Sequence, residues 1–238
     1  MGQFSDLTFI TNEAGHSLLD RFKVLTKDTR FFDVLVGYFY TSGFYALSES
    51  LEKTEKIRIL IGIGTGSDTV HLINQSKQQT FQFSHAEAKE SFSNQVASEM
   101  EGSPDNKVIE QGVHRFLEWL KTGKLEIKAY PSQNIHAKLY IMTFADGDRD
   151  KGRVITGSSN FTQAGLVDNL EFNVELKARS DYDFALQKFN ELWADAIDVK
   201  DEYVQTIETQ HITIKGIVKN VELNYTEATL HKLITRTR

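Results

Sequence analysis

The sequence predicts an α/β protein, a three-layer sandwich in which a mixed, largely parallel central sheet is flanked by helices. Two nearly continuous apolar segments, FFDVLVGYFY (31–40) and KIRILIGIG (56–64), have the composition of strands that are buried on both faces. The segment between them, residues 42–53, has a helical pattern. A strand–helix–strand order is typical of parallel strands that a helix connects across one face of a sheet.

Composition sets the class of protein. The chain has 238 residues, of which 40% are hydrophobic and 25% charged, and it contains no cysteine. Disulfides, thiol nucleophiles, cysteine zinc sites and iron–sulfur clusters are therefore excluded. No segment reaches the roughly 20 apolar residues of a membrane span, and the amino terminus does not resemble a signal peptide. We expect a cytoplasmic protein with no membrane partner.

Helices and strands are predicted along the rest of the chain from apolar spacing. A strand at 6–11 precedes a helix that Asn12 is placed to cap and whose apolar positions include Leu18 and Phe22. Further elements are a helix ending at Gly123, a strand at 125–130, a hairpin of strands 136–144 and 153–157, a strand at 169–178 and a helix at 180–197.

Residues 1–200 are predicted to form one domain, with two segments that differ in character. Residues 68–106 are polar and rich in Gln and Ser, which indicates a helical insertion. Residues 201–238 form a basic carboxy-terminal extension: its part 211–238 has five Lys and Arg against two Asp and Glu, a charge of +3, although the whole chain carries −6. Its pattern fits a dimerisation arm, an appendage or a linker to another domain.

Two basic residues on one strand form the core of a candidate anion site. His136 and Lys138 are two residues apart, so in a strand their side chains project to the same side. The next strand ends in a turn that contains Ser158, Ser159 and Asn160, which adds hydroxyl, amide and backbone donors. Together these groups suit a phosphate.

A carboxylate follows this turn. Glu171 lies in an alternating segment, where it is either a solvent-facing side chain or the group that orients and polarises an imidazole. Two competing motifs are weaker. Residues 62–66 have glycines at alternate positions but lack the GK[ST] of a phosphate loop, and residues 146–150 have alternating aspartates without the glycine and glutamate of a calcium loop. Both are interpreted as turns.

The pattern His136-x-Lys138, GSSNFT (157–162) and Asn169-Leu-Glu171 resembles the HxK, GSxNxT and NxE motifs of the phospholipase D superfamily. It is most similar to single-motif nuclease-type members, such as the cleavage domains of metal-independent restriction endonucleases and helicase-associated phospholipase D-like domains. The resemblance implies a phosphodiesterase in which His136 attacks phosphorus and forms a phosphohistidine. It further implies that Lys138, Ser158, Ser159 and Asn160 bind the phosphate, that Glu171 fixes the His136 tautomer, and that no metal or cofactor is needed.

Family active sites combine two copies of the motif, and this sequence has one. The resemblance therefore implies a homodimer in which each chain contributes one His136. DNA is the expected substrate, and a recognition domain or a helicase or ATPase partner is a further expectation.

One position departs from the family pattern, because Thr143 stands where the motif has an aspartate. Asp146, three residues later, is a candidate substitute. The alternatives to a nuclease are a phospholipase or phosphatidyl-transferase, which shares the chemistry, and a catalytically silent module that binds phosphate or DNA.

Overall fold

The computed structural model describes residues 8–13, 15–37, 39, 41–62, 107–130 and 135–199. The predicted insertion at 68–106 and the extension at 201–238 lie outside these residues. Eight strands form one sheet in the order β1-β7-β6-β5-β2-β3-β4-β8. Their bounds are β1 Phe9–Ile10, β2 Thr29–Val36, β3 Lys56–Gly62, β4 Leu125–Tyr130, β5 Lys138–Phe144, β6 Gly152–Gly157, β7 Asn173–Leu176 and β8 Ile197–Asp198.

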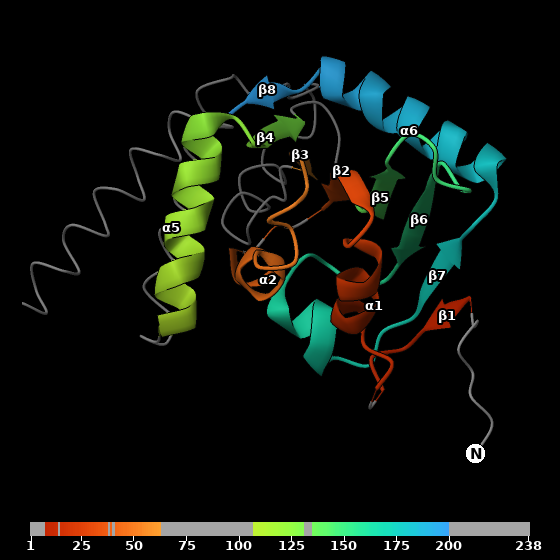
Figure 1. The fold of residues 1–238 in the computed structure, drawn as a ribbon, viewed down its shortest axis with the longest axis horizontal. Helices are drawn as coiled ribbons and strands as arrows, with labels where there is room; N and C mark the ends of the chain where they lie inside the picture. Colours follow the sequence, from red (N-terminus) through yellow and green to blue (C-terminus); the bar gives the residue numbers. More distant parts are fainter. Residues whose placement is uncertain are drawn as a thin grey trace, which may run out of the picture.

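Helices cover both faces of this sheet (Figure 1), which confirms the predicted three-layer sandwich. One face packs against α1, α2, α5 and a short π-helical turn, η1; the other packs against α6. The bounds are α1 Leu18–Leu25, α2 Thr41–Leu47, α5 Lys107–Thr122, η1 Ala164–Asp168 and α6 Arg179–Ala194.

The sheet is mixed, as predicted, but its parallel part is smaller than the sequence suggested. Strands β2, β3 and β4 run parallel to one another, whereas the other five neighbouring pairs among the described strands are antiparallel. Local connection explains part of this difference: β5 and β6 form the predicted hairpin, and β7 returns beside β6 after η1. The other antiparallel pairs, β2 with β5, β1 with β7 and β4 with β8, join segments that are distant in the chain. The parallel strands are the ones that helical segments connect.

The predicted helix ends are confirmed at Gly123 and corrected at Asn12. Gly123 follows α5 with a φ of +77°, the left-handed conformation that glycine adopts readily. The N-cap of α1 is Ser17, whose hydroxyl accepts the Asp20 N–H at 3.0 Å. Asn12 still accepts the Leu18 N–H at 2.7 Å, because its side chain folds back over the helix start.

A cluster of aromatic rings fills the core on the α1/α2/α5 face. Phe161 is fully buried, with ring centroids 6.3 Å from Phe32, 6.1 Å from Tyr140 and 5.9 Å from Phe39. Phe161 directly follows Asn160, so burial of this ring anchors the turn that carries the predicted phosphate donors.

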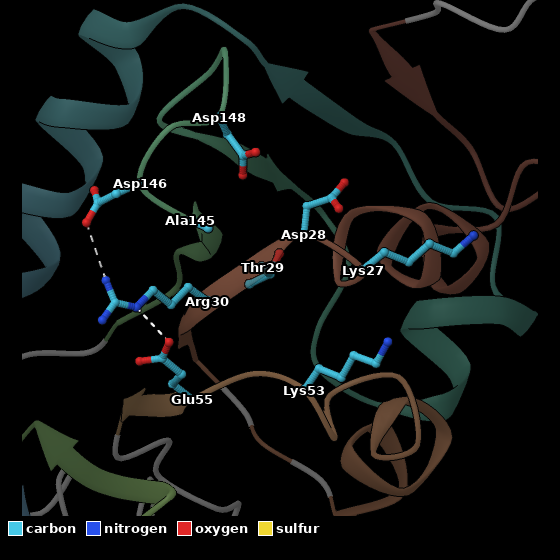
Figure 2. A pocket seen from close by; sticks show the side chains of 9 residues that line it. All are labelled: Lys27, Asp28, Thr29, Arg30, Lys53, Glu55, Ala145, Asp146 and Asp148. Atoms are coloured by element: carbon cyan, nitrogen blue, oxygen red, sulfur yellow. Dashed lines mark hydrogen bonds and ion pairs between the residues drawn. The ribbon is translucent and has the colours of Figure 1, made fainter.

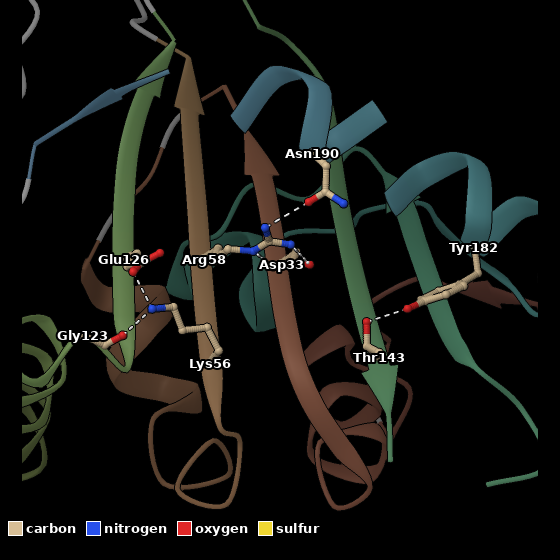
Figure 3. Close-up of polar contacts among 8 residues, drawn as sticks. All are labelled: Asp33, Lys56, Arg58, Gly123, Glu126, Thr143, Tyr182 and Asn190. Carbon is tan, nitrogen blue, oxygen red and sulfur yellow. Dashed lines mark hydrogen bonds and ion pairs between the residues drawn. The ribbon is translucent and has the colours of Figure 1, made fainter. Parts of the chain in front are cut away.

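A buried ion pair lies on the other face, under α6. Arg58 makes two hydrogen bonds to the Asp33 carboxylate, at 2.6 and 2.7 Å, and a third to the Asn190 side chain at 3.0 Å (Figure 3). Its guanidinium also lies over the Phe189 ring, 4.9 Å from the centroid. Burial raises the pKa of Asp33, and the Arg58 guanidinium opposes this shift only in part. The pair therefore joins β2 and β3 to α6.

We predict that Asp33→Ala lowers the free energy of unfolding by about 3–5 kcal/mol, because Arg58 loses the partner that compensates its own burial. The double variant Asp33→Leu/Arg58→Met should lose less than the single variant, since it removes both charges together. Urea denaturation of the three proteins measures both values. A double variant that is less stable than Asp33→Ala would contradict this account of the pair.

Candidate functional site

The predicted site residues lie on segments at the end of the sheet where β2 and β3 finish. Val36, the last residue of β2, pairs with Lys138, the first residue of β5. Gly157, the last residue of β6, pairs with Asn173, the first residue of β7. Ligands of open α/β sheets bind at the carboxyl ends of parallel strands, and the carboxyl ends of β2 and β3 lie here.

His136 and Lys138 are neighbours, although only Lys138 belongs to a strand. The sequence places His136 in a strand that begins at residue 136, whereas β5 begins at Lys138 and His136 precedes it. The Lys138 ammonium donates to the His136 carbonyl oxygen at 3.1 Å. The His136 side chain is exposed, and no hydrogen bond to its imidazole is present in the part of the chain that the structure describes. The imidazole is therefore accessible to a substrate, and the Lys138 ammonium contacts the backbone of the same residue.

Ser158 braces the loop before β7. Its N–H donates to the Phe172 carbonyl oxygen at 3.1 Å, and its hydroxyl oxygen accepts the Phe172 N–H at 3.0 Å. The same hydroxyl donates to the Glu171 carboxylate. The turn after β6 and the carboxylate that follows it are thus held as one unit.

Ser159 points into the protein. It is fully buried, its hydroxyl accepts from the Asn173 amide at 2.9 Å, and its N–H donates to the Asn173 side-chain oxygen at 3.3 Å. The buried Tyr140 hydroxyl donates to the Ser159 carbonyl oxygen at 2.8 Å. This differs from the predicted direct contact between Ser159 and phosphate: because the side chain is inside, it positions the turn.

Asn160 has an amide that no hydrogen bond fixes among the described residues. Its side-chain oxygen is buried without a partner, and its NH₂ group makes no hydrogen bond to the described chain. The main chain is held by the Thr162 N–H, which donates to the Asn160 carbonyl oxygen at 2.9 Å. A fixed backbone with an available NH₂ group is suited to bind a phosphate oxygen.

Glu171 contacts Ser158, and no contact between Glu171 and His136 is present among the described residues. The predicted orientation of His136 by Glu171 stays a prediction. Burial raises the pKa of Tyr140 well above its usual value, and the negative charge of Glu171 raises it further. Tyr140 therefore remains a hydroxyl donor to the turn.

Thr143 lies far from His136. It is near the other end of β5, five residues beyond Lys138, a separation of roughly 16 Å at the rise of a strand. Its hydroxyl is 2.7 Å from the Tyr182 hydroxyl of α6 (Figure 3). Asp146 does not take its place, because Asp146 is 85% exposed in the turn after β5, where it faces Arg30 at 3.6 Å. The departure from the family motif thus leaves the His136 end of β5 unchanged.

A hollow of about 420 Å³ lies at the opposite edge of the sheet. Arg30 forms ion pairs of 2.7 Å with Glu55 and 3.6 Å with Asp146. Figure 2 shows Arg30 between these two carboxylates, with Lys27 and Lys53 on the other side of the hollow. None of the predicted site residues lines it. Two of the acidic residues that line it, Asp146 and Asp148, belong to the turn after β5, which agrees with the interpretation of residues 146–150 as a turn. The other two, Asp28 and Glu55, directly precede β2 and β3.

Several residues that hold the site were not assigned to it from the sequence. Tyr140 and Asn173 clamp Ser159, and Asn12 donates to the carbonyl oxygens of Gly165 and Asn169 at 2.9 and 3.0 Å. Tyr140 is two residues from Lys138, so strand alternation was the signal that could have placed both on one face. Asn12 carried no such signal, since its partners are about 150 residues away.

Residues 30–193 match a family model described as cardiolipin synthase, PLD-like domain. The match covers more than half of the chain, and the protein belongs to this phospholipase D-like family. No curated protein matches the sequence. No helix in the described part of the chain is long and apolar enough to cross a membrane.

Several solved structures are similar to this chain at low identity. The archaeal chromatin protein TrmBL2 is 15% identical over 84% of this chain and 56% of its own, with a TM-score of 0.41. Nuc from Salmonella typhimurium is 14% identical over 75% of this chain and 88% of its own, with a TM-score of 0.42. Phosphatidylserine synthase from Haemophilus influenzae is 12% identical over 90% of this chain and 46% of its own, with a TM-score of 0.49. The chain thus spans about half the length of the first and third.

We predict that Thr143→Asp lowers stability and leaves the chemistry of the site unchanged. A carboxylate at this position adds a second negative charge on the α6 face near Asp33, whose charge already acts on Tyr182. Thermal unfolding of the variant should show a lower midpoint, while the turnover rate of the folded protein stays within about twofold of wild type. A large gain in turnover would show that Thr143 limits catalysis.

Proposed function

We propose that the protein is a metal-independent phosphodiesterase that cleaves nucleic acid, with DNA as its substrate, through a phosphohistidine on His136. The observation that supports this most is the exposed His136 side chain, together with the Lys138 ammonium that donates to the His136 carbonyl oxygen, at the same end of the sheet as the turn that carries Ser158 and Asn160. Restriction or another form of DNA processing is the biological setting we infer, with recognition supplied by a further domain or an ATPase partner.

The first chemical step is an attack of the His136 imidazole nitrogen on phosphorus. An N–P bond forms as the bond to the leaving oxygen breaks, and a second histidine donates a proton to that oxygen. Lys138 and the Asn160 NH₂ group stabilise the negative charge on the non-bridging oxygens. In the second step water attacks phosphorus, the second histidine takes a proton from the water, and His136 leaves.

Ser158 and Glu171 have supporting roles in this proposal. Ser158 holds Glu171 and the backbone of Phe172, so it fixes the carboxylate beside the phosphate site. When substrate binds, Glu171 orients the imidazole that carries the phosphoryl group, which requires it to exchange its Ser158 contact for one with His136. Lys138 and the Asn160 NH₂ group supply the charge stabilisation that a metal supplies in other phosphodiesterases.

The open position of the site supports a polymeric substrate. The side chains of His136, Ser158 and Phe172 are exposed, so an extended phosphodiester backbone can reach the nucleophile from solvent. The Phe172 side chain is 62% exposed while both its backbone groups are bonded to Ser158. A fixed, exposed ring beside the site is suited to stack on a base.

A lipid phosphodiester is the second candidate, because the neighbouring Leu170 is also exposed, at 71%, and an apolar rim suits a lipid surface as well. Parallel assays on DNA and on phospholipid vesicles separate the two. Turnover of vesicles alone would overturn the nucleic-acid proposal.

We predict that the wild-type protein cleaves plasmid and short duplex DNA in excess EDTA, and that His136→Ala, prepared identically, does not. The loss should be at least about a thousandfold, since the nucleophile is removed. Binding of DNA by the variant, measured by fluorescence anisotropy, should remain. If both proteins bind DNA and neither cleaves it, the chain is a phosphate-binding module.

The single HxK motif requires a second copy of the chain to supply the leaving-group acid, and we propose a homodimer with the two-fold axis through the site. Specific activity should therefore rise with protein concentration over the range in which analytical ultracentrifugation detects dimer. Mixing wild type with excess His136→Ala should lower activity beyond simple dilution, because mixed dimers have one histidine. Full specific activity in a solution of monomers would contradict the shared site.

A further inference from the structure

The chain must cross two strands immediately before it reaches His136. In the sheet, β4 and β5 are separated by β3 and β2, although β5 follows β4 in the sequence. The described part of the connection, from Ile135 on, lies against the residues at the ends of β3 and β2. Ile135, within this connection, packs with the residues under α6.

Two glycines lie under this crossing. Gly62 is the last residue of β3, and Gly37 directly follows β2; the parallel register that pairs Val36 with Ile61 sets them side by side. A Cβ atom at Gly37 would be 2.5 Å from the Ile135 carbonyl oxygen and 3.5 Å from the His136 Cα. A Cβ atom at Gly62 would be 2.9 Å from both the Cβ and the carbonyl oxygen of Ile135.

Glycine is required at these two positions because the Ile135 backbone approaches them closely, and not because the chain adopts an unusual backbone conformation there. Neither Gly37 nor Gly62 is among the described glycines with a positive φ. The atoms that a Cβ would strike are mainly backbone atoms of Ile135, which cannot rotate away as a side chain can. Any side chain at either position must therefore displace the Ile135–His136 backbone.

We propose that Gly37 and Gly62 are positioning residues for the nucleophile. Because they have no side chains, the Ile135–His136 backbone lies directly against the ends of β2 and β3, and this contact sets the position of His136. We call this pair of glycines the glycine seat. The proposal rests on the proposed function, in which His136 attacks phosphorus. A catalytic group must be held within about 0.5 Å of its productive position, and a misplacement of about 1 Å can reduce turnover about a hundredfold. A methyl group at either glycine is large enough to cause such a displacement.

The test uses the full chain with Gly37→Ala and Gly62→Ala. Histidine-labelled protein gives an NMR signal for each of the seven histidines, and the His136 signal is identified by its absence from His136→Ala. We expect the His136 resonance to shift in both variants and kcat on DNA to fall about 10- to 100-fold. KM should change by no more than about twofold, because Lys138 and Asn160 still bind the phosphate.

Gly152→Ala is the matched control. A Cβ atom at Gly152 would lie 2.1 Å from the Met142 carbonyl oxygen and 2.6 Å from the Tyr182 ring, so it creates the same kind of clash at the opposite end of β5 and β6. It should lower the melting temperature and leave the His136 resonance and the kcat of the folded protein unchanged.

The outcomes separate this proposal from the proposed function. A folded Gly37→Ala protein that keeps the wild-type His136 resonance and kcat would contradict the positioning role of the glycines. A Gly152→Ala protein in which the His136 resonance shifts by the same amount would also contradict it. If Gly37→Ala does not fold, Gly62→Ala decides by the same criteria. If the wild-type protein does not cleave DNA, the proposed function fails. The comparison of His136 resonances still decides whether Gly37 and Gly62 position His136.

Discussion

The hydrogen bond from the buried Tyr140 hydroxyl to the Ser159 carbonyl oxygen joins the two halves of the site. Tyr140 belongs to β5, the strand that begins with Lys138, and Ser159 belongs to the turn that carries Asn160. Burial keeps the pKa of Tyr140 high, so the donor is always present, and Phe161 packs beside the same ring. The geometry of the exposed groups thus depends on a contact in the core.

Stability and chemistry are divided between regions of the same sheet. The Asp33–Arg58 pair and the Thr143–Tyr182 contact lie on the α6 face, whereas the proposed reacting groups lie at the edge where β2 and β3 end. This division explains how Thr143 can replace the aspartate of the family motif without a change near His136. It also explains why the glycines at the site edge have a different role from Gly152, at the far end of the hairpin.

The sequence predicted what depends on local pattern. Apolar runs placed β2 and β3, and the residues around the turn placed the hairpin. The HxK and GSxN motifs lie at the start of β5 and the end of β6, which are neighbours in the sheet. It overestimated the parallel part of the sheet, because strand direction depends on pairing between distant segments. The sequence did not indicate the hydrogen bond from Asn173 to Ser159 or the close approach of Ile135 to Gly37 and Gly62. Both depend on contacts between segments that are distant in the chain, and no local spacing reveals such contacts.

The central claim is that His136 is the nucleophile, and capture of the covalent intermediate tests it most directly. Wild-type protein mixed with end-labelled DNA, quenched in alkaline detergent during turnover and digested for mass spectrometry, should carry a nucleotide adduct on the peptide that contains His136. The adduct should be lost in acid, as a phosphohistidine is, and be absent from His136→Ala. Turnover without an adduct, or an adduct on another residue, would contradict the account.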